Sequence, residues 1–220
     1  MTRPTAARSF RPRRRGLSPA QQEAFDRDAP RWSIDERGPL LDLAVVFPDH
    51  SDVVLDVGFG AGEALIALAA SRPDQAVIGV EIHTPGLARV VQAIEHHRWS
   101  HVRIARADAL DLMPRIPLSS LAGIRLWFPD PWPKQRQRHR RIVRPDVVTA
   151  WVDRLRVGGW LHLATDIDDY AEQVVAVMGG ESRLRGCRIE RPEWRPVTRF
   201  EARGRAEGRV ATDLWYERSG

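Results

Sequence analysis

From residue 52 onward, short runs of apolar and β-branched residues alternate with segments in which apolar residues recur at the helical period. The runs that predict strands cover residues 53–57, 76–80, 102–105, 124–128 and 160–164. The segments that predict helices cover residues 61–71, 86–97 and 147–156. Strands that alternate with helices favour a parallel sheet with helices on both faces, and therefore an α/β, doubly wound fold.

The end of the chain departs from this alternation. Five arginines between residues 195 and 209 precede a last strand-like run over residues 213–216. We expect this run to return to the edge of the sheet as a C-terminal antiparallel strand.

The beginning of the chain is rich in arginine and proline. Six arginines occur before the first acidic residue, Glu23, and Pro4, Pro12 and Pro19 interrupt any long helix. The sequence therefore predicts a basic, mobile arm over residues 1–30 and a single domain over residues 31–220. The alternative for the arm is a solvated terminus that binds no partner.

Composition narrows the class of protein. The net charge of +5 favours a polyanionic partner. The number of arginines is weaker evidence for such a partner, because arginine has largely replaced lysine throughout the chain: Lys134 is the only lysine among 34 basic residues. The single cysteine, Cys187, excludes an internal disulfide and a cysteine-rich metal site, and we expect it to be a packing residue. With no long apolar run and no signal-peptide pattern, we expect a cytoplasmic protein that binds neither membrane nor metal.

A glycine-rich turn follows the first predicted strand. Gly58, Gly60 and Gly62 come directly after residues 53–57, and a predicted helix begins within the turn. Glycines let a ligand approach the backbone closely, and the start of the helix offers free N–H groups. A tight structural turn is the alternative, because three glycines alone are weak evidence for a nucleotide-like site.

Carboxylates at the ends of successive strands favour one cofactor. Glu81 ends the second strand, where it can hold both hydroxyls of a ribose, and Asp108 follows the third strand, where it can accept from an adenine amino group or cap a helix. The G-x-G-x-G spacing differs from the G-x-G-x-x-G of dinucleotide sites, and Asp56 would repel a pyrophosphate. We therefore expect S-adenosylmethionine, whose methionine end is cationic and which carries no phosphate, rather than NAD.

Aromatic residues and prolines are concentrated where the fourth predicted strand ends. Residues 128–134 read Phe-Pro-Asp-Pro-Trp-Pro-Lys, and the prolines that flank Asp130 stiffen the loop. A carboxylate held there can accept from the N1–H and N2–H donors of a guanine and leave N7 free. Methylation at N7 needs no general base, because N7 carries no proton. A simple Pro-Asp-Pro turn is the alternative.

A basic run lies directly after this loop. Residues 134–144 contain one lysine, five arginines and one histidine among their basic positions, and no acidic residue occurs before Asp146. Arginine and lysine neutralise phosphates without reading sequence, so the run favours RNA contact beside the candidate site. A solvated charged face is the alternative.

Three motifs resemble those of one family. The Phe-Pro-Asp-Pro-Trp-Pro-Lys loop, the Ala-Thr-Asp of residues 164–166 and the Arg-Pro-Val-Thr-Arg-Phe-Glu of residues 195–201 are similar to signatures of bacterial tRNA (guanine-N7)-methyltransferases. The resemblance implies a Rossmann-like class I methyltransferase fold with a seven-stranded sheet, S-adenosylmethionine as donor, and a guanosine of the tRNA variable loop as acceptor. It implies donor contacts from Asp56, Glu81, Asp108 and Asp130, with Asp130 also catalytic, and substrate contacts from Lys134, Asp166, Thr198, Arg199, Phe200 and Glu201.

Two positions depart from the family pattern. Asp56 stands where many members have glutamate, and Arg199 where lysine is common; both keep the charge, although arginine changes hydrogen-bond geometry. The alternatives are a methyltransferase that acts on another RNA base or on an amine, an NAD-linked oxidoreductase, and an RNA-binding module without catalysis. The sequence does not indicate the oligomeric state.

Overall fold

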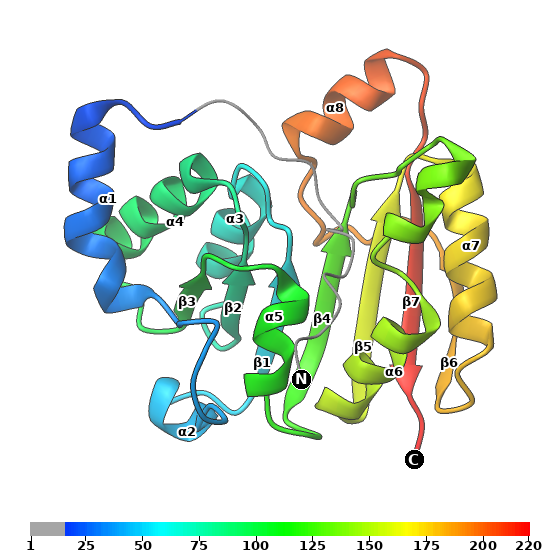
Figure 1. Cartoon of the computed structure of the whole chain (residues 1–220), viewed down its shortest axis with the longest axis horizontal. Helices are drawn as coiled ribbons and strands as arrows, with labels where there is room; N and C mark the ends of the chain where they lie inside the picture. The colour runs from blue at the N-terminus through cyan, green and yellow to red at the C-terminus, as the bar shows by residue number, and fades with distance from the viewer. Residues whose placement is uncertain (1–15) are drawn as a thin grey trace.

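A seven-stranded, mostly parallel sheet forms the centre of the computed structural model, which describes residues 16–220 (Figure 1). The strand order is β3-β2-β1-β4-β5-β7-β6. The strands are β1 (Val53–Val57), β2 (Ala76–Val80), β3 (Val102–Ala105), β4 (Leu121–Trp127), β5 (Leu155–Thr165), β6 (Leu184–Ile189) and β7 (Thr212–Arg218). The order reverses beside β1, so the carboxyl ends of β1 and β4 meet at a switch point, where ligands bind in such sheets. The predicted α/β, doubly wound fold is confirmed.

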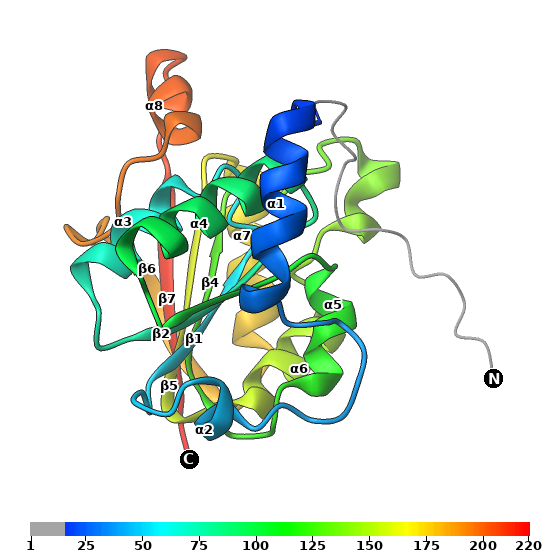
Figure 2. The same cartoon turned by 90° about the vertical axis from the view of Figure 1, so that its left-hand side faces the viewer.

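Helices cover the sheet in two layers (Figures 1 and 2). The layer of α1, α3 and α4 packs over β3, β2 and β1, whereas α6 and α7 pack on the opposite face near β5. The helices are α1 (Pro19–Trp32), α2 (Leu43–Val46), α3 (Glu63–Ser71), α4 (Thr84–His97), α5 (Ala109–Leu112), α6 (Pro145–Arg154), α7 (Asp168–Gly179) and α8 (Arg199–Ala206), with 3₁₀ turns η1 (Met113–Arg115) and η2 (Gln135–Arg140). Helix α8 stands beyond the carboxyl ends of the strands (Figure 1).

Helix α1 includes residues that were expected to belong to the arm. Ser18 caps the helix, and Pro19 stands in its first turn, where the missing N–H of proline costs no hydrogen bond. Phe25, Ala29 and Trp32 are buried in the same cluster as α4 and β3. The packed part of the chain therefore begins before residue 20, because a proline at a helix start does not prevent the helix. Residues 1–15 of the predicted arm lie outside the described residues.

The C-terminal part of the sheet differs in one respect from the expectation. Strand β7 is antiparallel to β5, as predicted, but β6 pairs with its other side and forms the outermost strand. Cys187 lies on β6 and is exposed, so the expectation that it packs in the core is wrong. The reason is that β6 is an edge strand in which only Leu184 is buried. Among residues 16–220, no helix is long and apolar enough to cross a membrane.

Candidate active site at the carboxyl edge of the sheet

A cavity of about 640 Å³ opens where β1, β2 and β4 end, a size typical of sites for small organic ligands. Its lining joins the glycine turn to the Pro-Asp-Pro loop and to the start of α8. Most of the predicted site residues lie on this lining: Asp56, Gly58, Gly60, Glu81, Asp108, Asp130, Asp166, Thr198, Arg199 and Phe200. Gly62, Lys134 and Glu201 are not among the lining residues.

The glycine turn leaves space on its cavity side. Gly58 and Gly60 have φ angles of +70° and +60°, which favour glycine, and no atom lies within 4 Å of a Cβ built at either position. Gly62 has a different role, because a Cβ there would lie 2.7 Å from Val90 Cγ2 of α4. Gly86, which the sequence analysis missed, lets α4 approach the turn, since its Cβ would lie 1.8 Å from the carbonyl oxygen of Gly60.

Glu81 braces this turn. Its Oε2 accepts a hydrogen bond of 2.8 Å from the Gly60 N–H. Its Oε1 accepts from the N–H groups of Ile82 at 2.7 Å and His83 at 2.9 Å. A carboxylate has about four lone-pair sites, and these three hydrogen bonds use both sites of Oε1 and one of Oε2. Glu81 can therefore hold the backbone and still accept from a ribose hydroxyl through Oε2.

Asp56 is a buried carboxyl that lacks hydrogen bonds on one oxygen. Only 4 % of the residue is exposed, and its Oδ2 has no hydrogen-bond partner within residues 16–220. Arg125 Nε lies 3.5 Å from Oδ2, at the directly opposed position of β4. Burial raises the pKa of the Asp56 carboxyl, and the charge of Arg125 opposes that rise. Asp56 also borders the cavity, so a cationic group of a ligand can lie close to this carboxyl.

Asp108 serves two purposes at the third strand end. Its side chain caps α5 by accepting 3.0 Å from the Leu110 N–H, so the helix-cap interpretation is confirmed. It also lines the cavity, where its carboxylate can lie against a bound ligand.

The loop after β4 is held in a constrained conformation. Phe128 has φ +53° and Trp132 has φ +42°, values that are uncommon for bulky residues and occur most often at functional sites. The Phe128 N–H donates to Ala164 O at 2.7 Å, and Arg141 Nε donates to Pro131 O at 2.8 Å. These bonds place Asp130 on the wall of the cavity.

The basic run after this loop is only partly available to a partner. Lys134 and Arg136 are exposed at the start of η2. Arg141 is fully buried and donates to Asp169 at 2.9 Å, and Arg138 lies 2.6 Å from the same carboxylate. The sequence did not separate these two groups, because the spacing of arginines does not tell which of them turn inward.

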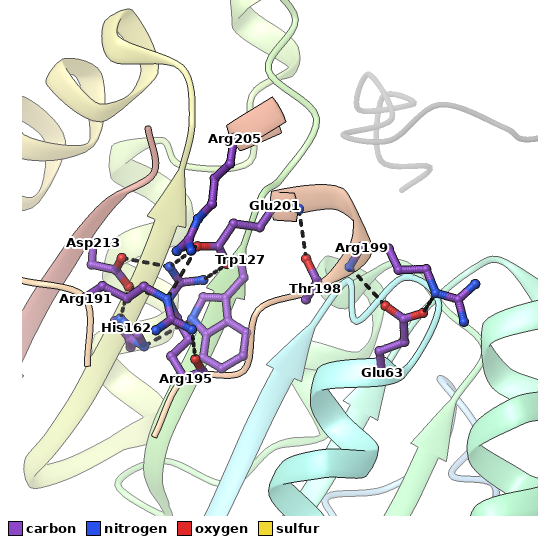
Figure 3. Close-up of polar contacts among 10 residues, drawn as sticks. All are labelled: Glu63, Trp127, His162, Arg191, Arg195, Thr198, Arg199, Glu201, Arg205 and Asp213. Atoms are coloured by element: carbon purple, nitrogen blue, oxygen red, sulfur yellow. Dashed lines mark hydrogen bonds and ion pairs between the residues drawn. The ribbon is translucent and has the colours of Figure 1, made fainter. Parts of the chain in front are cut away.

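The start of α8 forms the remaining wall. Thr198 caps the helix by accepting 3.2 Å from the Glu201 N–H, and the ring of Phe200 lies 5.3 Å from that of Phe128. Glu63, at the first turn of α3, accepts 3.1 Å from the Arg199 N–H and forms an ion pair with the Arg199 side chain (Figure 3). Asp166 also lies on this wall, where its Oδ2 accepts from Arg209 Nε at 2.7 Å.

Behind this wall lies a buried group that we call the Arg195 cluster: Arg195, Glu201, Asp213 and His162 (Figure 3). Each of these residues is at most 2 % exposed. Arg195 donates to Glu201 at 2.7 Å and to Asp213 at 3.0 Å, and His162 Nε2 lies 2.9 Å from Asp213. Glu201 therefore faces the protein interior rather than the cavity.

The known proteins that this chain resembles are methyltransferases. Residues 50–214 match a family model described as a putative methyltransferase. A tRNA (guanine-N(7)-)-methyltransferase of Streptomyces avermitilis is 40% identical over 96% of this chain and 75% of its own length. One of Nitrosospira multiformis is 37% identical over 96% and 94%. The structure of the 16S rRNA methyltransferase KamB, 17% identical, superimposes with a TM-score of 0.61 over 83% of this chain and 96% of that chain, which supports the fold.

Proposed function

The chain belongs to the family of tRNA (guanine-N(7)-)-methyltransferases, and we propose that it transfers a methyl group from S-adenosylmethionine to N7 of a guanosine in the tRNA variable loop. The observation that carries this proposal is a single cavity whose lining joins Asp56, Glu81 and Asp108 on one side to Asp130 and the start of α8 on the other. Donor and acceptor can therefore meet at one place.

The donor half of the cavity fits the chemistry of S-adenosylmethionine. The carboxyl of Asp56, which borders the cavity, suits an ammonium group, and the open space at Gly58 and Gly60 admits a ligand against the backbone. We assign Glu81 to the ribose hydroxyls and Asp108 to the adenine amino group. When bound, S-adenosylmethionine supplies a methyl group activated by its sulfonium. Asp56 and Glu81 contribute negative charge opposite this cationic ligand.

The acceptor half holds a base rather than activating it. We assign Asp130 to the N1–H and N2–H donors of guanine, which turns N7 away from the carboxylate and toward the donor side. The constrained loop keeps Asp130 in place, so little order is lost when the base binds. As the methyl group is transferred, the base becomes cationic, and the nearby carboxylate stabilises that charge.

Exposed basic residues are suited to bind the parts of the tRNA that lie outside the cavity. We propose that Lys134 and Arg136 contact tRNA phosphates near the cavity, together with the arginines of residues 1–15. We therefore propose that the activity is cytoplasmic. Removal of residues 1–15 should weaken tRNA binding and leave donor binding unchanged; equal tRNA affinity with and without this segment would contradict its assignment.

Transfer of label tests the proposal directly. The protein is incubated with unmodified tRNA and methyl-labelled S-adenosylmethionine, and the nucleosides are then separated. Label in 7-methylguanosine is the expected result. Label on another base or on an amine would show that the acceptor atom is not N7 of guanosine. Donor binding without any transfer to tRNA would refute tRNA as the acceptor.

Asp130→Asn tests the catalytic assignment. The substitution keeps the shape of the side chain and removes its charge, so we expect kcat/KM for tRNA to fall by about 100-fold or more, as when one stabilising group is removed from an active site. Asp168→Asn is the matched control, because Asp168 is exposed in the first turn of α7, outside the cavity. Equal activity of the two variants would contradict the catalytic assignment of Asp130. Thermal unfolding of both variants checks that the fold is kept.

A further inference from the structure

Arg125 is a fully buried arginine that no part of the proposed reaction uses. Only 1 % of it is exposed, although arginine is rarely buried completely. It lies on β4 between two polar neighbours in register, Asp56 on β1 and His162 on β5. Its Nε and Nη2 have no hydrogen-bond partner among residues 16–220.

The pair formed by Arg125 and Asp56 is incomplete in itself. The two side chains approach to 3.5 Å, an ion-pair distance, yet Asp56 Oδ2 and two nitrogens of Arg125 make no hydrogen bond with the described residues. A buried ion pair is stabilising only when hydrogen bonds satisfy its remaining groups. A chain selected for stability alone would be expected to carry apolar residues at both positions. Asp56 borders the cavity, whereas Arg125 is not among the lining residues.

We propose that Arg125 is a positioning residue for the donor: its guanidinium keeps Asp56 as a carboxylate that faces the cavity, ready to receive the ammonium group of S-adenosylmethionine. The inference rests on the proposed donor and extends it to a residue outside the cavity. Arg125 itself does not touch the ligand.

The surroundings of the pair support this arrangement. Burial raises the pKa of Asp56, and the negative charge of Glu81 raises it further, so that Arg125 is the group that opposes protonation. The other cationic side chain that acts on Arg125 is Arg72, just after α3. His162 adds no charge, because its Nδ1 accepts from Trp127 Nε1 at 3.1 Å, which requires a neutral ring.

The consequence is a particular dependence of donor binding on pH. If Arg125 keeps Asp56 ionised near neutral pH, donor affinity should be constant between about pH 5.5 and pH 7, where the donor amino group stays protonated. In Arg125→Met, Asp56 is protonated in the free protein, and the donor must displace that proton. Donor affinity should then fall as pH falls, by up to about tenfold for each pH unit.

Calorimetric titration of the full chain with S-adenosylmethionine, without tRNA, tests the inference. We expect a constant Kd for the wild type and for Arg125→Lys, and a Kd that rises toward acidic pH for Arg125→Met. Asp56→Asn/Arg125→Met is the control, since it removes the titrating carboxyl and should bind weakly at every pH. His83 also lines the cavity, but it is present in all four proteins, so its contribution cancels in the comparison.

A folded Arg125→Met with the same constant Kd as the wild type would overturn the inference. If that variant does not fold, the number of protons that the wild type releases on binding the donor tests the inference instead. This number is measured at about pH 6 in buffers of different ionisation enthalpy, in a His83→Gln background. No proton released on donor binding supports the inference, and release of about one proton overturns it. Donor binding without transfer to tRNA would count against the proposed acceptor alone, whereas a wild type that binds no donor would remove the basis of both.

Discussion

The first turn of α8 is held from two sides by ion pairs of opposite character (Figure 3). On one side the Arg195 cluster is closed to solvent, with Arg195 fully buried between Glu201 and Asp213. On the other side the Arg199 side chain is 80 % exposed and meets Glu63 at the edge of the cavity. The buried contacts tie Glu201 of α8 to Asp213 of β7 through Arg195. The exposed contact leaves Arg199 able to exchange Glu63 for a phosphate, since pairs in water contribute little.

The largest expected effect is loss of the buried side. Arg195→Met removes the buried cation that Glu201 and Asp213 share. Glu201 then keeps only the less buried Arg191 and Arg205, and Asp213 keeps only His162. The free energy of unfolding should therefore fall by about 3–5 kcal/mol. Arg199→Met makes the same chemical change on the exposed side and is the matched control. Denaturant unfolding of both variants measures the difference. Equal losses in the two would contradict the distinction between the two sides.

A smaller effect should appear with pH. Burial lowers the pKa of His162 below the usual histidine value of about 6.5. Trp127 donates to Nδ1, which leaves Nε2 to donate to Asp213. Because the unfolded chain then binds the proton more readily, the contribution of His162 is complete above about pH 6.5 and decreases as the pH falls from there toward the lower folded-state pKa.

His162→Gln sharpens this prediction, since an amide can accept and donate without titrating. The free energy of unfolding, measured across this pH range, should depend less on pH in the variant than in the wild type. His101, whose pKa burial also lowers, contributes equally to both proteins. An unchanged slope in the variant would show that His162 carries a proton in the folded protein.

The smallest expected effect is on the exposed side. Glu63→Gln, Arg199→Met and the double variant form a cycle in which the coupling free energy should be about 0–1 kcal/mol and should decrease with added salt. Thermal unfolding measures the coupling. A coupling above about 2 kcal/mol, insensitive to salt, would mean that Arg199 is fixed by Glu63 and is not available to RNA.

The donor half of the cavity was largely predictable. Asp56, the glycines, Glu81 and Asp108 follow buried strands in sequence order, and parallel strands bring their carboxyl ends to one edge. What the sequence did not reveal was the role of each residue within that edge. Gly62 packs α3 against α4, and Asp108 caps α5 as well as lining the cavity.

The acceptor half was predictable only as a set of motifs. Residues 195–201 were identified as one unit, yet in the structure Arg195 and Glu201 are buried, while Arg199 and Phe200 line the cavity. The basic run likewise divides into Lys134, which is exposed, and Arg141, which is buried against Asp169. Arginine spacing carries no information on which face a partner occupies, because an acidic side chain from a distant element decides it.

The alternation of apolar strands with amphipathic helices determined the fold class, since burial of apolar faces at these two periods leaves few ways to pack them. The motif at Asp130 predicted a residue that lines the cavity and marks the place of the proposed acceptor site. Only the tertiary structure decided that Arg125 stands behind Asp56, that Glu63 meets Arg199, and that helix α1 packs on α4. These contacts join residues far apart in the chain, and they depend on strand order and helix placement, which local sequence patterns do not encode.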